Sequence, residues 1–330
     1  MRDDDQTVPG GSRLTGQAEK NRKGGECRES LPRPSDMRTH RRIRYRLTSL
    51  ILAAALLWGQ APQVQAAGDT AAVRDTEAVR ETARLTSDTE AEEGTTLVIP
   101  DGTTEIGDFA YAYTTQYQHV IILDSVKKIG KNAFRQSSIV SVEMGDGVEE
   151  IGERAFYGCS RLTRAELSES LVSVNYAAFQ SCEALEEVRL PAGLRTLGSS
   201  AFEYCSSLRR IELPGGLSDF DGAFRSSGLE AVELGEGITE IPQYAFYNCL
   251  SLKQVTFPGS LVSVGDNAFG YSGLEELVLP DTVEVLGDYS FQSCSQLTRV
   301  VFPEGLTQIG QQAFYRCGSL TEVLIPDSVT

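Results

Sequence analysis

Six cysteines recur at one position of a repeated octet, and cysteine is a residue type that can do chemistry. The octet reads AFYGCSRL at residues 155–162, and close copies of it follow along the chain. Thiols at such regular spacing could form disulfides, bind a metal or act as nucleophiles. The six are Cys159, Cys182, Cys205, Cys249, Cys294 and Cys317.

None of these chemistries suits a column of equivalent thiols. Stacked repeats place equivalent side chains parallel and ~4.8 Å apart, whereas the Cβ atoms of a disulfide close to ~3.8 Å. A straight column does not bring four ligands around one tetrahedral metal. Residues 67–330 contain a single histidine, His119, and one base does not activate six equivalent thiols. We therefore predict no catalytic, metal-binding or cofactor-binding residues, and no enzyme.

The remaining interpretation is that the cysteines are small buried hydrophobic side chains. Three repeats carry serine instead, at Ser137, Ser227 and Ser272, and the same repeats have one residue fewer before the next strand. We expect the longer turn to direct cysteine inward and the shorter turn to let serine cap backbone groups. The predicted structural core comprises Phe156, Cys159, Phe179, Cys182, Phe202, Cys205, Phe246, Cys249, Phe291, Cys294, Phe314 and Cys317.

The elements that position these residues follow from the repeat. An aromatic residue recurs ten times between Tyr111 and Phe314, always after 22 or 23 residues, and such a period is typical of a solenoid. In each unit an alternating apolar stretch fits a short strand that proline ends, and the segment x-x-A-F-x-x-C fits one tight helical turn. We predict an α/β repeat solenoid with a parallel β-sheet on one face and short helical turns on the other.

Units such as LEEVRLPAGLRTLGSSAFEYCSS, residues 185–207, resemble the BspA-like leucine-rich repeat. The resemblance covers roughly residues 97–330 and all ten units. It implies a curved leucine-rich-repeat solenoid. It also implies a secreted or surface protein of bacteria, a class in which some members are adhesins that bind host matrix proteins or other cells. The unit with GLSDFDGAF departs from the pattern, since it is one residue short and replaces Ile-Gly with Phe220-Asp221.

The chain before the repeats divides into three segments. Residues 1–36 are expected to be an upstream extension from a mis-assigned start, and residues 37–66 a signal peptide, because arginines precede an apolar run too short to span a membrane. Cleavage is expected near Ala66–Ala67, with an uncleaved anchor as the alternative. Residues 67–94 suit a linker or disordered segment. The solenoid occupies 95–330 and stops part-way through a unit, so we expect further repeats or domains beyond residue 330.

Charge limits the class of partner. Residues 1–66 hold 12 basic and 7 acidic side chains, which leaves 18 basic and 39 acidic in residues 67–330, a net charge of −21. This acidic body argues against nucleic acid, because phosphate binding needs clustered lysine and arginine. On the strand face the sign of the exposed charges alternates from unit to unit, for example Arg209, Glu230 and Lys253. We expect these charges to pair across neighbouring strands.

A second exposed column changes from charged to apolar along the chain. It runs through Glu143, Glu166, Arg189, Glu212 and Glu233 and then through the hypothetical partner-binding residues Thr256, Val278, Val301 and Leu324. Ordinary mid-sheet residues are the alternative. We expect a non-enzymatic, secreted or cell-surface protein that binds a protein or glycan, with no cofactor and no membrane span in the mature chain. Two alternatives stay open: the recognition module of a larger secreted protein or enzyme, and a structural spacer.

Overall fold

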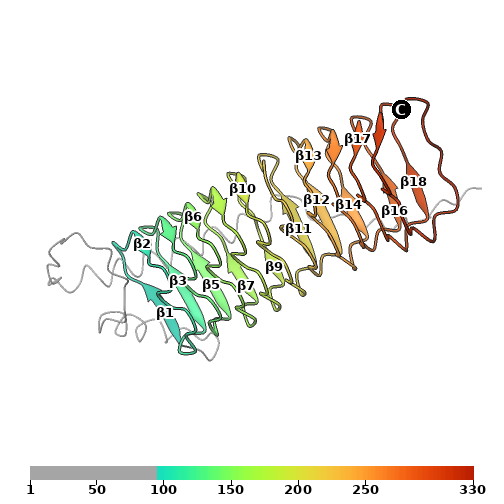
Figure 1. The fold of residues 1–330 in the computed structure, drawn as a ribbon. Helices are drawn as coiled ribbons and strands as arrows, with labels where there is room; N and C mark the ends of the chain where they lie inside the picture. Colours follow the sequence, from blue (N-terminus) through green and yellow to red (C-terminus); the bar gives the residue numbers. More distant parts are fainter. Residues whose placement is uncertain (1–94) are drawn as a thin grey trace, which may run out of the picture. The chain divides into compact units, whose positions relative to one another are not determined.

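A computed structural model of the protein describes residues 95–330. These residues form a stack of coils in which neighbouring strands pair in parallel, and the register shifts by 21 to 23 residues from one coil to the next (Figure 1). The expected extension, signal peptide and linker lie outside the described residues. Residues 95–330 contain strands and turns but no helix, and therefore no helix able to cross a membrane.

One row of strands comes from the first half of each repeat, and we call it the long-strand row. Its residues alternate between core and surface, as in β12, whose residues are half-buried, buried, exposed and buried in turn. Its members are β1 (Thr96–Ile99), β3 (His119–Ile122), β5 (Ser141–Met144), β7 (Arg164–Glu166), β9 (Glu187–Val188), β11 (Arg210–Leu213), β12 (Ala231–Leu234), β14 (Gln254–Thr256), β16 (Glu276–Val278) and β18 (Arg299–Val301).

A second row of two-residue strands precedes the glycine of most repeats, and we call it the short-strand row. The prediction of a sheet on a single face missed it. Its members are β2 (Glu105–Ile106), β4 (Lys128–Ile129), β6 (Glu150–Ile151), β8 (Ser173–Val174), β10 (Thr196–Leu197), β13 (Glu240–Ile241), β15 (Ser263–Val264), β17 (Val285–Leu286) and β19 (Gln308–Ile309).

Both rows are interrupted. The short-strand row breaks once, between β10 and β13, where a single bridge from Thr196 to Asp219 replaces a strand in the short unit. The long-strand row breaks between β9 and β11 and again between β14 and β16. Between β14 and β16 only the long-strand row is open, because β13, β15, β17 and β19 still pair continuously beside it.

The prediction of helical turns is wrong, because the segment around Phe179 forms successive β-turns. The N–H groups of Ala178, Gln180 and Cys182 bond to carbonyls three residues earlier. The alternate N–H groups, those of Ala177, Phe179 and Ser181, donate instead to carbonyls of the next coil at 2.8–3.0 Å. A helix would use every N–H within its own segment, so sharing them between coils excludes it. We call this third set of inter-coil bonds the turn ladder.

Two left-handed residues per coil make the turn ladder possible. They lie four residues apart, as at Ala177 with φ 54° and Ser181 with φ 60°, and the pattern recurs in all ten turns. Glycine fills only two of these twenty positions, Gly158 and Gly222. A left-handed conformation costs a non-glycine residue about 1–2 kcal/mol, and the inter-coil hydrogen bonds offset that cost.

Aromatic rings form the centre of the core. Ten rings, from Tyr111 to Phe314, stack along the coils with centroids 4.9–5.6 Å apart and planes within 18° of parallel. Phe156, Phe179 and Phe202 are fully buried, whereas Phe314 in the last ring of the stack is half-buried. The stack shows why one repeat does not bury its own ring and needs neighbours on both sides.

Candidate partner-binding site

The six cysteines lie side by side inside the turns, and all of them are buried free thiols. Each thiol donates a hydrogen bond to the phenylalanine carbonyl of the preceding coil, at 3.0–3.3 Å. The Phe179 carbonyl, for example, accepts from both the Cys182 N–H and the Cys205 thiol. Cysteine is thus more than a hydrophobic filler here, because it satisfies a buried backbone acceptor.

Burial makes Cys159, Cys205 and Cys249 poor nucleophiles. It raises the pKa of Cys205 to about 12 and the pKa values of Cys159 and Cys249 to about 11. Only the thiolate attacks or binds a metal, and these groups hold their protons at neutral pH. Within residues 95–330 no three His, Cys, Asp or Glu side chains gather as a possible metal site.

The three serines of the column occupy the same buried place. Ser137, Ser227 and Ser272 lie with their hydroxyl oxygens 3.2–3.3 Å from the sulfur of the following coil's cysteine. The expected capping of backbone groups therefore gives way to a contact with the next thiol. Serine and cysteine are parts of one buried polar column, which leaves the outer faces of the coils free to vary.

The four hypothetical partner-binding residues all lie on the strand face. Val278 is 53% exposed and Leu324 is 79% exposed, Thr256 is exposed, and Val301 is half-buried. Val278 and Val301 are register partners on β16 and β18. The structure divides the four residues between two openings in the face: Thr256 and Val278 line one, and Val301 and Leu324 line the other.

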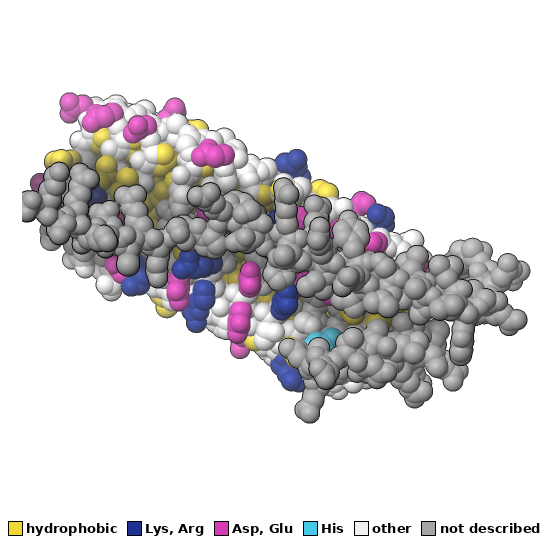
Figure 2. All heavy atoms as spheres, turned by 180° about the vertical axis from the view of Figure 1, so that it is seen from behind, with side chains coloured by type: hydrophobic (Ala, Val, Ile, Leu, Met, Phe, Trp, Pro, Cys, Tyr) yellow, Lys and Arg dark blue, Asp and Glu magenta, His cyan; other side chains and the backbone are white. Residues whose placement is uncertain are grey.

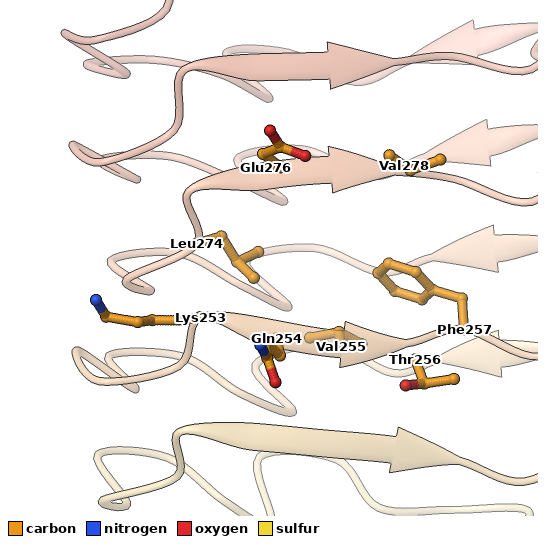
Figure 3. A pocket seen from close by; sticks show the side chains of 8 residues that line it. All are labelled: Lys253, Gln254, Val255, Thr256, Phe257, Leu274, Glu276 and Val278. Carbon is orange, nitrogen blue, oxygen red and sulfur yellow. The ribbon is translucent and has the colours of Figure 1, made fainter. Parts of the chain in front are cut away.

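The first cleft opens where β14 and β16 fail to pair. It has a volume of about 270 Å³. Leu274 and the ring of Phe257 lie between the two strands, while Thr256 and Val278 flank the opening (Figure 3). Val255, whose equivalents Val232 and Leu277 are buried, is only half-buried here. The opening thus exposes side chains that neighbouring coils keep in the core.

The second cleft lies two coils further on, between β18 and residues 321–325. Its volume is about 730 Å³, and Val300, Phe302 and Ile325 line it together with Val301 and Leu324. Val300 and Phe302 are half-buried, as Val255 and Phe257 are. The two openings therefore repeat the same construction at equivalent positions.

Phenylalanine at the last inward position of the strand accompanies both clefts. Phe257 and Phe302 precede prolines in the sequences TFP and VFP, where other repeats have Leu, Ile or Met. Phe257 meets Phe269 edge-on, with centroids 6.1 Å apart, and Phe302 meets Phe314 in the same manner at 5.7 Å. Both openings therefore coincide with a larger ring at this position. The break between β9 and β11 follows Leu190 and has no such ring.

Charges surround the first cleft in an ordered way. Lys253 pairs with Glu275 at 2.7 Å, and Glu276 pairs with Arg299 at 3.7 Å, as the alternating column predicts. Figure 2 shows basic and acidic side chains interspersed on the described surface. Glu212 and Glu233 differ, because they are exposed register partners of like charge and form no ion pair within residues 95–330. The sequence placed them in a charged column but did not single them out.

Tyrosines and arginines form a separate group at the turns. The Arg225 guanidinium lies 5.5 Å from the Tyr244 ring centroid and 5.7 Å from that of Tyr247, which also meets Tyr271 edge-on. Such cation–π contacts stabilise neighbouring coils. Because arginine already lies over these rings, the strand face is the better candidate for partner binding.

The chain resembles known repeat proteins over most of its length. A family model described as "BspA type Leucine rich repeat region" matches residues 91–209 and 220–330, in six copies. The unmatched residues 210–219 belong to the unit in which the short-strand row breaks. No curated protein matches the chain.

Several solved structures are similar. A leucine rich cell surface protein from Faecalibacterium prausnitzii is 25% identical, with a TM-score of 0.49 and coverage of 71% of this chain and 76% of that chain. A leucine-rich repeat protein from Bacteroides ovatus is 25% identical, with a TM-score of 0.43 and coverage of 68% and 77%. The leucine rich repeat protein of T. pallidum is 24% identical, with a TM-score of 0.38 and coverage of 66% and 83%.

Proposed function

Because the chain belongs to the BspA-type leucine-rich repeat family, we propose that it is a non-enzymatic, secreted or cell-surface protein that binds a protein or glycan. The observation that carries the binding role is the surface column of Thr256, Val278, Val301 and Leu324 over two openings of the strand face. In a solenoid the residues that repeat from unit to unit form the core, so the variable side chains between them are left for recognition.

The chemistry of the described residues supports a binding protein over an enzyme. The recurring thiols are buried, and the raised pKa values of Cys159 and Cys205 keep these two thiols protonated at neutral pH. The His119 ring contacts the Ser141 hydroxyl at 2.8 Å on the neighbouring strand. Each of the six thiols donates to a phenylalanine carbonyl instead of a base, so none of them has the adjacent base that covalent catalysis by cysteine requires.

Two measurements test the proposal. Tagged full-length protein is expressed in its own cells, and the medium, the intact cell surface and the cytoplasm are compared by immunoblotting and N-terminal sequencing. We expect export and a mature start near Ala67. The purified protein is then applied to immobilised extracellular matrix proteins and glycans. Exclusive retention in the cytoplasm would overturn the surface assignment, and a failure to bind any immobilised molecule would favour a structural spacer.

A further inference from the structure

We infer that the first cleft and the glutamates beside it form a docking surface for a polypeptide segment that carries a basic side chain three residues from an apolar one. This inference rests on the proposed binding function and deepens it, because it names the class of partner and the place where that partner binds. Three features carry it: the order of the residues in the column, the size and lining of the cleft, and the charge beside it.

The glutamates and the cleft are neighbours in register. Glu212 on β11 pairs in register with Glu233 on β12, and Glu233 pairs in register with Thr256 on β14, which lines the cleft. Adjacent parallel strands lie about 4.8 Å apart. Two carboxylates and an apolar opening therefore follow one another along a single exposed line.

The charge of that line selects a basic partner. Like charges directly opposite each other destabilise a sheet, and neither Glu212 nor Glu233 has a basic partner within residues 95–330. A lysine or arginine that sits between the two carboxylates would relieve the repulsion, and an arginine fork suits carboxylates especially well. The net charge of −21 over residues 67–330 also draws a basic segment towards the surface.

The cleft selects an apolar side chain of a polypeptide. Its inner wall is formed by Val255, Phe257 and Leu274. A volume of about 270 Å³ is below the roughly 300–1,000 Å³ of small-molecule sites and suits one or two side chains. Protein interfaces commonly use such an anchor in a pocket.

The spacing of the two features sets the motif. From the midpoint of the glutamate pair to the middle of the cleft is about two strand spacings, or roughly 10 Å. A polyproline II segment rises about 3.1 Å per residue and has three residues per turn, so side chains three residues apart lie on the same side. A partner that crosses the strands in this conformation therefore places its basic and apolar side chains three residues apart, in either chain direction.

A peptide selection tests the inference. A phage library of random 12-residue peptides is selected on the immobilised full-length protein. We expect the enriched peptides to carry Lys or Arg three residues from Leu, Ile, Phe or Trp. Binding of the corresponding synthetic peptide should weaken with added salt, because exposed charges are screened. A library that yields no enriched peptide, or peptides without this spacing, would overturn the inference.

Matched variants then locate the site. Glu212→Gln/Glu233→Gln should weaken peptide binding about three- to tenfold, and Val278→Glu, which places a carboxylate at the cleft, should weaken it more than tenfold. The control is Glu143→Gln/Glu166→Gln, which makes the same charge change on register partners far from the cleft. Thermal unfolding verifies that each variant is folded. Equal losses in the control and test pairs would contradict the inference.

The same variants separate this inference from the proposed function. If a matrix protein or glycan binds the wild-type chain and binds these variants equally well, the docking surface is wrong while the binding function stands. If the wild-type chain binds neither the selected peptides nor any immobilised molecule, both fail. Binding that is lost in Val278→Glu and retained in the control pair supports both.

Discussion

The thiol of Cys205 donates a hydrogen bond to the carbonyl oxygen of Phe179, 3.3 Å away in the preceding coil. The same carbonyl accepts the N–H of Cys182 in its own turn at 3.2 Å. One backbone oxygen thus joins the turn of one coil to the side chain of the next. This relationship repeats wherever cysteine occupies the column, and it explains why a regularly spaced thiol belongs to the architecture.

Replacing Cys205 tests that relationship. We expect Cys205→Ala to lower the free energy of unfolding by about 1–3 kcal/mol, because it leaves the buried Phe179 carbonyl with one bond fewer and opens a small void. Cys205→Ser retains a donor and should cost less. Urea unfolding measures both. Neither variant should alter peptide binding, so a folded variant that lost binding would show that the thiol acts in recognition.

The raised pKa values predict a loss of stability in alkaline solution. An unfolded cysteine titrates near pH 8.5–9, whereas burial raises the pKa of Cys205 to about 12. Stability from this group is complete below the unfolded pKa and falls as pH rises towards the folded pKa, because the unfolded state releases its proton first. The free energy of unfolding should therefore decline from about pH 9 upwards.

The Cys205→Ala variant isolates one titrating group. Between pH 9 and 11 its free energy of unfolding should decline less steeply than that of the wild type, by about 1.4 kcal/mol per pH unit. Tyrosines and lysines titrate in both proteins and cancel in the difference. Parallel pH profiles would mean that the Cys205 thiol titrates at the same pH in the folded and unfolded chains.

The left-handed residues of the turns predict opposite effects of two substitutions at Ser181, which has φ 60°. Ser181→Val should destabilise the protein by about 1–3 kcal/mol, because a β-branched side chain is strained in this conformation. Ser181→Gly should be neutral or stabilising, since glycine adopts it freely. Thermal unfolding compares the two, and a valine variant as stable as the glycine variant would argue against this backbone conformation.

A smaller side chain at Phe257 should change the strand pairing beside it. Phe257→Leu places at this position the residue that the closed coils carry, so we expect β16 to pair with β14 and the cleft to close. Hydrogen exchange of the amides of Glu276 and Val278 should then slow, and peptide binding should fall.

The reciprocal substitution is the control. Leu234→Phe introduces the ring into a coil whose strand β12 pairs with β14, and it should open that ladder at a cost of about 1–3 kcal/mol. Faster amide exchange in β14 would report the opening. If neither substitution changes amide protection, the ring size does not control the cleft.

The repeat, the stack of phenylalanines and the family were all within reach of the sequence, because a strict period of 22 or 23 residues determines which side chains lie next to each other. The conformation of the turns was not, and the sequence wrongly suggested helical turns. Left-handed residues are usually recognised by glycine, and here Ala177, Ser181 and Tyr204 adopt that conformation without such a signal. The short-strand row escaped notice because two residues are too few for a periodic pattern.

The clefts mark a different limit. The column containing Val278 could be identified as exposed and apolar, but a break in the ladder depends on ring size at Phe257 and on the fit of whole coils. Leucine and phenylalanine are equivalent in a hydrophobic pattern and differ in volume. The change from Leu-Pro to Phe-Pro at the end of the strand was visible in the sequence. Its effect on strand pairing could be seen only in the structure. Likewise, the pairing of Glu212 with Glu233 depends on register.

The break between β14 and β16 also has a mechanical consequence. Most neighbouring coils are joined by three sets of backbone hydrogen bonds, whereas these two coils are joined by the short-strand row and the turn ladder alone. A tensile load along the stack would therefore be carried by fewer bonds at this joint. The joint between β9 and β11 has fewer still, because the short-strand row is reduced there to a single bridge, so both joints would yield before the fully paired ones.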